Sequence, residues 1–437
     1  MGLDTQAFDG ALKDVAEPFI AEQVNNANPL QDLMDFEETD FGGREKYYSA
    51  HVGRNRSPMF TREDGASATA GNQVHVPVRI DQRKMTGRIR ITYEAMVDSV
   101  GRENAFVSAR RDEMERLIDD MARRQEFALA TDGRGVLARV DEANPDGDTT
   151  LELDAPGGVT GDDFGNRFIE NGMFLAFINP STGALRTQVA TQSSVVAVNS
   201  DGTDVTLSSG TIGTDVANSD YVVQSANGTV TAVTDTSWEA AWWGLEAHID
   251  DGTNRTNYFG IDRNTYDAYN SYVVSSTGAL SLDLLQRVAD VTDQKLGGKI
   301  SLIACHHSIR RLYIQLLEAD RRYSGADLKR PDGGTVAFKQ GDLTVGEVPI
   351  RAIRDIALGS MYLLDAENTG FVQYVSEAGK WVDEDGSILQ RVGTESSFKD
   401  AFEAVYRIRK QFHARHPGKS AKLTGITGQT LVVVRAP

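Results

Sequence analysis

The triplet Cys305-His306-His307 combines residue types that could supply a thiolate nucleophile or part of a metal site. It lies near the end of the segment KISLIACHHS, which predicts a buried strand. Neighbouring residues on a strand point to opposite faces, so Cys305 and His306 cannot easily bind one ion, and the chain has no second cysteine to complete a zinc site. A catalytic thiol would also need a histidine and an orienting group brought to it by the fold. We therefore expect a buried cysteine at the end of a strand, with a helix starting after it.

The second pattern with chemical potential is Gly133-x-Gly135-x-x-Ala138, one form of the glycine fingerprint that holds a dinucleotide pyrophosphate. That fingerprint needs a strand before it and a helix after it, so that the N-terminus of the helix faces the phosphates. Here the order is reversed, because a charged helical pattern precedes the glycines and turn-rich β segments follow them. The glycines are therefore expected to end a helix and form a turn, and no nucleotide cofactor is predicted.

Three acidic segments, DGDTT, NSDGTDVT and VDEDGS, carry oxygen ligands that calcium could use. None of them fits the EF-hand loop, which places a glycine at its centre and a glutamate at its end, so ordinary turns are expected. The sequence thus presents no convincing catalytic residues, metal site or cofactor site, and we expect a protein that is not an enzyme.

The composition excludes several classes of protein. With 437 residues, 40% of them hydrophobic, the chain can form two or three domains, and no apolar run approaches the roughly 20 residues that cross a bilayer. A net charge of -18 argues against a dedicated nucleic-acid reader, but not against a container that encloses DNA. A single cysteine and an N-terminus without the features of a secretory signal favour a reducing, intracellular compartment.

The elements that would position functional residues begin with an acidic, weakly periodic arm at residues 1–43. From Arg44 on, the chain predicts a long hairpin, whose strands at 74–80 and 88–92 enclose a tip at 81–86. Pro77 in the first strand favours an edge position. A hairpin with few large apolar residues cannot pack a core alone, so it is expected to lie on another chain.

The strongest helical pattern covers residues 103–130, where Val107, Met114 and Ile118 continue one apolar stripe among many charged residues. At 1.5 Å per residue this helix would be roughly 40 Å long. Its alternating charges predict a spine that lies over a sheet and is largely exposed.

The remainder alternates between β-rich and mixed segments. Short β runs separated by turn dipeptides predict a small antiparallel barrel or sandwich over about 140–235. Two amphipathic helices, SLDLLQRVADVTDQKL and SIRRLYIQLLEADRRY, flank a buried strand and predict an α+β domain over about 271–380. Phe402 to Phe412 alternate as a long half-buried strand, and a last strand is expected in TLVVVRAP.

The order of these parts resembles the major capsid protein of tailed bacteriophages, which has the Hong Kong 97-like fold. The passages that carry the resemblance are GRNRSPMFTREDGASATAGNQ followed by GRIRITYEAMVDS, then RRQEFALATDGRGVLA, and finally FEAVYRIRKQFHARHPGKSAKLTGI. It implies an α+β subunit of an icosahedral shell that encloses double-stranded DNA without reading its sequence. It divides the chain into an N-terminal arm (1–43), an extended loop or E-loop hairpin (44–92), a peripheral-domain spine helix (93–139), a β-rich insertion (140–235), a further peripheral segment (236–270), an axial domain (271–380) and closing peripheral strands (381–437).

The resemblance also implies partners. They would be other copies of the chain in hexamers and pentamers, a portal protein, a separate scaffolding protein and a decoration protein, in a virion capsid assembled in the host bacterial cytoplasm and without a membrane. Some members of the family join subunits by a Lys-Asn isopeptide bond, for which Lys84 is the candidate lysine at the expected hairpin tip.

Arginines are the expected contact residues between subunits. Hairpin arginines would pair with acidic residues of the arm and loops, such as Glu37 and Asp64. Reversing the charge at Arg88 and Arg90 should then impair assembly without unfolding the subunit. Arginines near the end of the spine are expected to act in the same way. The candidates are Arg79, Arg83, Arg88, Arg90, Arg123, Arg124 and Arg134.

Two other interpretations stay open. The same fold could form an encapsulin-type bacterial nanocompartment that carries an enzyme, which a native shell without DNA would indicate. A hydrolase or a β-rich surface-binding protein could instead use 140–235 to bind a ligand, which a persistent monomer with a defined ligand pocket would indicate.

Overall fold

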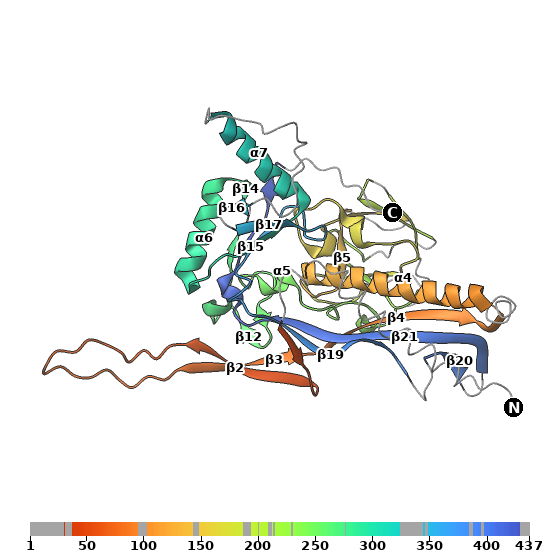
Figure 1. Ribbon diagram of the computed structural model, residues 1–437, viewed down its shortest axis with the longest axis horizontal. Helices are drawn as coiled ribbons and strands as arrows, with labels where there is room; N and C mark the ends of the chain where they lie inside the picture. Colours follow the sequence, from red (N-terminus) through yellow and green to blue (C-terminus); the bar gives the residue numbers. More distant parts are fainter. Residues whose placement is uncertain are drawn as a thin grey trace.

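In the computed structural model, three larger sheets are arranged around one long helix, and a two-stranded ribbon extends away from them (Figure 1). Most of the expected arm and the expected strand at 430–437 lie outside the described residues. The structure describes residues 30, 37–94, 103–142, 148–186, 194–199, 201–208, 212, 215–228, 230–275, 277–323, 344–345, 348–383, 388–394 and 397–428.

The first sheet is built on β21 (Ser397–Ala414), whose even-numbered residues between 404 and 412 are buried while the odd-numbered residues 405–409 are partly exposed. This confirms the predicted long, half-buried strand. Parallel pairing joins β1 to β19, and β21 pairs antiparallel with β19, β20 and β4. The bounds of its partners are β1 (Glu37–Asp40), β19 (Phe371–Trp381), β20 (Gln390–Thr394) and β4 (Arg83–Thr92).

Helix α4 (Glu103–Ala130) has the predicted bounds and lies over the face of this sheet that carries Ile89 and Ile408 (Figure 1). The expectation that it is largely exposed is wrong for its last turns, because residues 125–130 are all buried. Phe127 enters the core of the second sheet, and Gly244 packs directly against the last carbonyl groups of the helix. These contacts come from segments that follow the helix in sequence, so its own pattern could not show them.

The second sheet is antiparallel throughout, as expected for the β-rich segment that was predicted to form a barrel or a sandwich. Its strand order is β7-β10-β5-β6-β9-β8, every pair is antiparallel, and a bridge between Phe174 and Ser194 brings β8 beside the start of β7. The interior is apolar, with Leu151 and Val205 fully buried. The strands are β5 (Val136–Val140), β6 (Thr150–Asp154), β7 (Leu175–Ile178), β8 (Val195–Val198), β9 (Asp204–Leu207) and β10 (Tyr221–Gln224).

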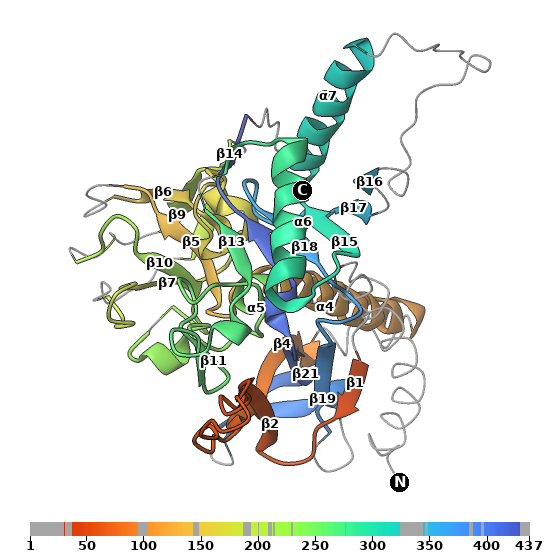
Figure 2. The ribbon, with the colours of Figure 1, turned by 90° about the vertical axis from the view of Figure 1, so that its left-hand side faces the viewer.

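The third sheet has the order β13-β22-β18-β15-β17-β16 and packs one face, which carries Ile303 and Ile350, against helices α6 and α7 (Figure 2). Both helices and the buried strand between them were predicted, and Ser281 and Gly297 cap α6 at its two ends. The elements are β13 (Tyr272–Val274), α6 (Leu282–Leu296), β15 (Leu302–Cys305), α7 (His307–Tyr323), β16 (Thr344–Val345), β17 (Val348–Ala352), β18 (Met361–Leu364) and β22 (Ala421–Leu423).

Two strands cross the boundaries that the sequence suggested. β19 ends at residue 381 and so falls almost entirely in the expected axial domain, but it pairs with β21 in the first sheet. β22 lies after residue 381 but pairs with β13 and β18 in the third. The short helix α5 (Leu245–His248) and two small strand pairs complete the fold, namely β11 (Asn257–Tyr258) with β12 (Ile261–Asp262) and β14 (Gly278–Ala279) with β23 (Ile426–Thr427).

The predicted hairpin is wrong in its pairing. β3 (Val74–Asp81) pairs with β2 (Glu45–Gly53), and the connecting loop at the far end is 54–73. Only Gln82 separates β3 from β4, which pairs with β21 instead. Lys84 is therefore opposite Arg409 within a sheet and not at a hairpin tip. β3 and β4 alternate in the same way, so the local pattern did not distinguish their partners.

Candidate functional site

The ribbon, formed by β2, the loop 54–73 and β3, projects from the body of the molecule (Figure 1). Within its loop, Met59 is 57% exposed and the side chain of Phe60 is fully exposed. A two-stranded ribbon is marginally stable in water unless another surface covers it. The ribbon therefore presents apolar side chains that a second chain can bury.

An aromatic cluster fixes the base of the ribbon to the body. Val78 and Ile80 of β3 are fully buried and belong to one apolar cluster with Tyr258 and Phe259. The backbone N–H of Arg79 donates to the carbonyl of Phe259 at 2.8 Å. The direction in which the ribbon leaves the body is thus set by buried contacts.

A buried hydrogen bond reinforces this base. The hydroxyl of Tyr48 on β2 lies 2.6 Å from Nε2 of His413 on β21, whose side chain is fully buried. Burial lowers the pKa of His413 well below its ordinary value, and the neighbouring His248 lowers it further. The His413 ring is therefore neutral at physiological pH, and a change that charged it would disturb the attachment of the ribbon.

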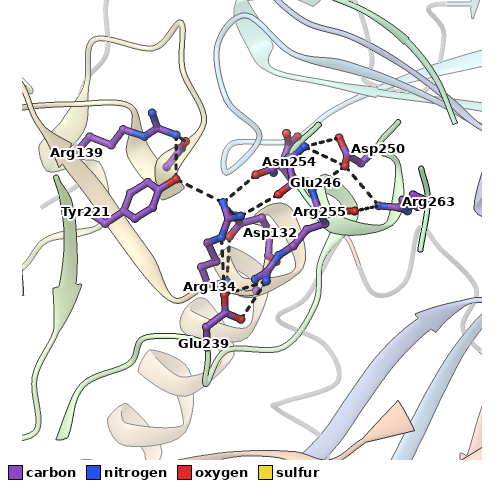
Figure 3. A network of polar contacts seen from close by, with 12 residues as sticks. Asp132, Arg134, Arg139, Tyr221, Glu239, Glu246, Asp250, Asn254, Arg255 and Arg263 are labelled. Carbon is purple, nitrogen blue, oxygen red and sulfur yellow. Dashed lines mark hydrogen bonds and ion pairs between the residues drawn. The ribbon is translucent and has the colours of Figure 1, made fainter. Parts of the chain in front are cut away.

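The Gly133-Arg134-Gly135 turn is a structural joint and not a phosphate site (Figure 3). The turn connects α4, which ends at Ala130, to β5, which confirms the predicted order. Arg134 donates through Nη1 to the carboxylate of Asp132 at 3.0 Å and to the Asn254 side chain at 2.9 Å. Both glycines have a positive φ, near 75°.

Three arginines surround the carboxylate of Glu239 beside this turn, two of which, Arg134 and Arg255, are labelled in Figure 3. Arg255 donates to both of its carboxylate oxygens, at 2.9 and 3.0 Å, while Arg134 and Arg83 approach the carboxylate to 3.8 and 4.0 Å. Arg83 also donates to two backbone carbonyl groups, at 2.7 and 3.0 Å. Arg83 and Arg134 are therefore committed to partners within the subunit. Their place in the network was not visible in the sequence, because Glu239 lies more than a hundred residues away.

The arginines at the end of the spine contact the barrel. Arg123 lies 3.4 Å from the carboxylate of Glu170, and Nη2 of Arg124 lies 3.0 Å from the sulfur of Met173. These contacts join α4 to the segment before β7. They give the two arginines a role inside the subunit that needs no neighbouring copy.

The other three candidate arginines are exposed. The guanidinium of Arg79 lies over the ring of Tyr47, with 5.8 Å to the centroid. Arg88 and Arg90 form no hydrogen bond or ion pair with any residue that the structure describes. A contact of these side chains with another subunit stays a prediction.

Cys305 is buried at the end of β15, and α7 starts at His307, as predicted. Burial raises the pKa of its thiol to about 12, so it is not a nucleophile at neutral pH. His306 instead meets Arg167 of the barrel segment, with 2.8 Å between Nε2 and the guanidinium. Burial, and then Arg167, lower the pKa of His306 to about 3. The pair links the barrel to the third sheet.

A buried ion pair links α5 to the third sheet. Nζ of Lys422 on β22 donates to one carboxylate oxygen of Glu246 at 2.8 Å, and the hydroxyl of Tyr362 on β18 donates to the other at 2.6 Å. Glu246 and Lys422 are 5% and 3% exposed. Sequence reasoning missed this group because 176 residues separate the two charges.

Within the part of the chain that the structure describes, no group of three or more His, Cys, Asp or Glu side chains is placed to hold a metal ion. Searched over the same residues, no helix combines the length and apolarity that crossing a bilayer requires. The features that stand out are the exposed ribbon and the joints that brace the body.

The fold is similar to known capsid structures. A chain of the Cyanophage A-1(L) capsid asymmetric unit superposes with a TM-score of 0.54 at 12% identity, covering 92% of this chain and 93% of that chain. The holo-SrpI encapsulin complex from Synechococcus elongatus PCC 7942 matches with a TM-score of 0.42 at 11% identity, covering 94% and 92%. No protein-family model and no curated protein matches the sequence.

Proposed function

We propose that this chain, which has the Hong Kong 97-like α+β fold, is the major capsid protein of a tailed bacteriophage and forms the icosahedral shell around packaged DNA. The observation that carries the proposal is the ribbon, which leaves the body and exposes Phe60 completely. Fully burying such a side chain contributes about 1.5–3 kcal/mol. In a closed assembly of identical subunits that contribution repeats at every copy.

In this proposal the domains are the arm (1–43), the E-loop (44–92), the spine (93–139), the insertion (140–235), a peripheral segment (236–270), the axial domain (271–380) and the closing strands (381–437). Because β19 pairs within the first sheet and β22 within the third, we assign β19 to the closing strands and β22 to the axial domain. The first sheet with α4 is then the peripheral domain, and the third sheet with α6 and α7 is the axial domain.

The proposed protein acts by assembly and not by catalysis. Its partners are other copies in hexamers and pentamers, a portal protein, a scaffolding protein and a decoration protein, within a virion assembled in the host bacterial cytoplasm. The net charge of -18 supports enclosing double-stranded DNA without binding it tightly along the whole inner surface.

Electron microscopy of the expressed protein, alone and together with a candidate scaffolding protein, tests this proposal. We expect closed shells or hexamers from the wild type and at least tenfold fewer from Phe60→Asp. The control is Val196→Asp on β8, where an apolar side chain is 53% exposed and lies outside the ribbon. A wild-type protein that stays monomeric at high concentration refutes the proposal. Native shells that hold an enzyme in place of DNA would show a nanocompartment instead.

A further inference from the structure

The first sheet carries a row of cations on the face that points away from α4. On β4, Gly87 lies against Met121 and Leu117 of the helix, so the residues on either side of it point to the opposite face. Residues directly opposite each other on antiparallel strands share a face. The register therefore places the exposed side chains of β4 beside those of β21. We call this set the basic stripe, and its members are Lys84, Arg88, Arg90, Arg407 and Arg409.

The basic stripe is not neutralised within the subunit. None of its five side chains forms a hydrogen bond or ion pair with the residues that the structure describes. Lys84 and Arg409 are directly opposite each other, an arrangement that destabilises a sheet because like charges repel. Nε of Arg407 is buried and has no hydrogen-bond partner in the described part of the chain. The sheet thus holds a repulsive set of charges that an anionic partner would relieve.

The neighbouring charges on the same face do not change this balance. Glu403 is opposite Arg90 on β4, and across β19 Glu377 and Lys380 are opposite Arg409 and Arg407. Glu377 lies 4.0 Å from Lys380, so these two offset each other. Five cations and one remaining carboxylate leave a net positive surface on a chain whose total charge is -18.

We propose that the basic stripe binds residues 1–29 of the acidic N-terminal arm of a second copy of this chain. This segment has five acidic residues against one lysine, Lys13, which makes it complementary in charge to the stripe. The inference rests on the proposed assembly of many copies and names one contact that holds them together. The acidic residues are Asp4, Asp9, Asp14, Glu17 and Glu22.

The anchor of the arm favours a neighbouring stripe over the stripe of the same chain. Leu30 is fully buried, and its N–H lies 3.1 and 3.2 Å from the two carboxylate oxygens of Glu126 on α4. Leu30, the described residue next to this segment, thus lies on the helix side of its own sheet, opposite the basic stripe. A chain of 29 residues can extend on the order of 95 Å, which is enough to reach another subunit.

The test uses two complementary variants of the full chain. The stripe variant is Arg88→Glu with Arg409→Glu, and the arm variant replaces Asp4, Asp9 and Asp14 by Asn and Glu17 by Gln. We expect each alone to give at least tenfold fewer shells than the wild type, with an unchanged urea unfolding midpoint. A mixture of the two should recover shells, because the arm of the first can bind the stripe of the second.

The control is Arg287→Glu, which reverses an exposed charge on α6 outside the stripe and should assemble like the wild type. A stripe variant that assembles normally overturns the inference while leaving the proposed function intact. A mixture without recovery also overturns it, since the contact would then lie within one chain. Normal shells that fail only to retain DNA would show that the stripe binds nucleic acid. A wild type that forms no shells refutes the proposed function and the inference together.

A direct binding measurement completes the test. A fluorescent synthetic peptide of residues 1–29 should bind the unassembled wild-type subunit in fluorescence anisotropy, and added salt should weaken this binding by screening the charges. Binding to the stripe variant should fall at least tenfold, whereas binding to Arg287→Glu should be unchanged. Equal binding to all three proteins would overturn the inference.

Discussion

Replacing Lys422 with Met should loosen the joint between α5 and the third sheet. Nζ of Lys422 donates to Glu246 at 2.8 Å, and the hydroxyl of Tyr362 donates to the other carboxylate oxygen at 2.6 Å. Both charged residues are almost completely buried. Methionine keeps the length and apolar stem of lysine but not its charge, so the variant leaves a buried carboxylate with the tyrosine but without its cation.

The expected loss follows from this burial. Removing one partner of a buried ion pair costs about 3–5 kcal/mol, because the other charge stays in an apolar environment without compensation. The double variant Lys422→Met with Glu246→Gln removes both charges and keeps an oxygen that accepts from Tyr362. Its cost should be about 1 kcal/mol, the scale of one lost hydrogen bond. The second substitution should therefore restore most of the stability that the first removes.

Urea unfolding of the unassembled subunit, followed by the fluorescence of its four tryptophans, measures both variants. The matched control is Lys295→Met, which removes a lysine 3.1 Å from Asp267. The Asp267 side chain is 78% exposed, so this loss should stay below about 1 kcal/mol. The reasoning is refuted if Lys422→Met unfolds at the same urea concentration as Lys295→Met, or if the double variant is less stable than the single one.

Three further predictions concern local sites. Burial and Arg167 lower the pKa of His306 to about 3, so the unfolded chain binds a proton more readily than the folded one, and the free energy of unfolding should fall as pH falls from about 6.5 to 3. In urea unfolding at several pH values, the stability of His306→Gln relative to the wild type should therefore rise over that window, and a difference that stays constant with pH would contradict the prediction. Gly244→Ala would force a Cβ into the last carbonyl groups of α4 and should lower the free energy of unfolding by at least about 2 kcal/mol. In Gly87→Ala the new Cβ meets only flexible side-chain ends, so this variant should lose less stability, and equal melting temperatures for the two variants would contradict the prediction. The buried Cys305 thiol should react with a thiol reagent only on unfolding, and rapid labelling of the native subunit would be the contrary result.

Elements with a strong internal period could be predicted from the sequence. The charged helix at 103–130 and the alternating strand through Phe402 and Phe412 are found as expected, because burial of one face leaves its period in the residues themselves. The reversed order around Gly133 and Gly135 was likewise enough to discard a phosphate loop.

Strand pairing and long-range charge contacts could not be predicted in the same way. β3 and β4 follow each other and both alternate, yet β3 pairs with β2 and β4 with β21, so the expected tip around Lys84 does not form. The choice depends on which apolar faces can be buried together, and that is a property of the whole chain.

The sequence by itself determined the class of fold, the main helices and the absence of a convincing catalytic motif, because local periodicity and residue chemistry carry that information. Only the tertiary structure decided what each charged side chain does. It commits Arg83 and Arg134 to Glu239, buries Glu246 against Lys422, and places Lys84 opposite Arg409 of β21. The physical reason is that electrostatic partners are selected by distance and burial in space, and separation along the chain does not encode either.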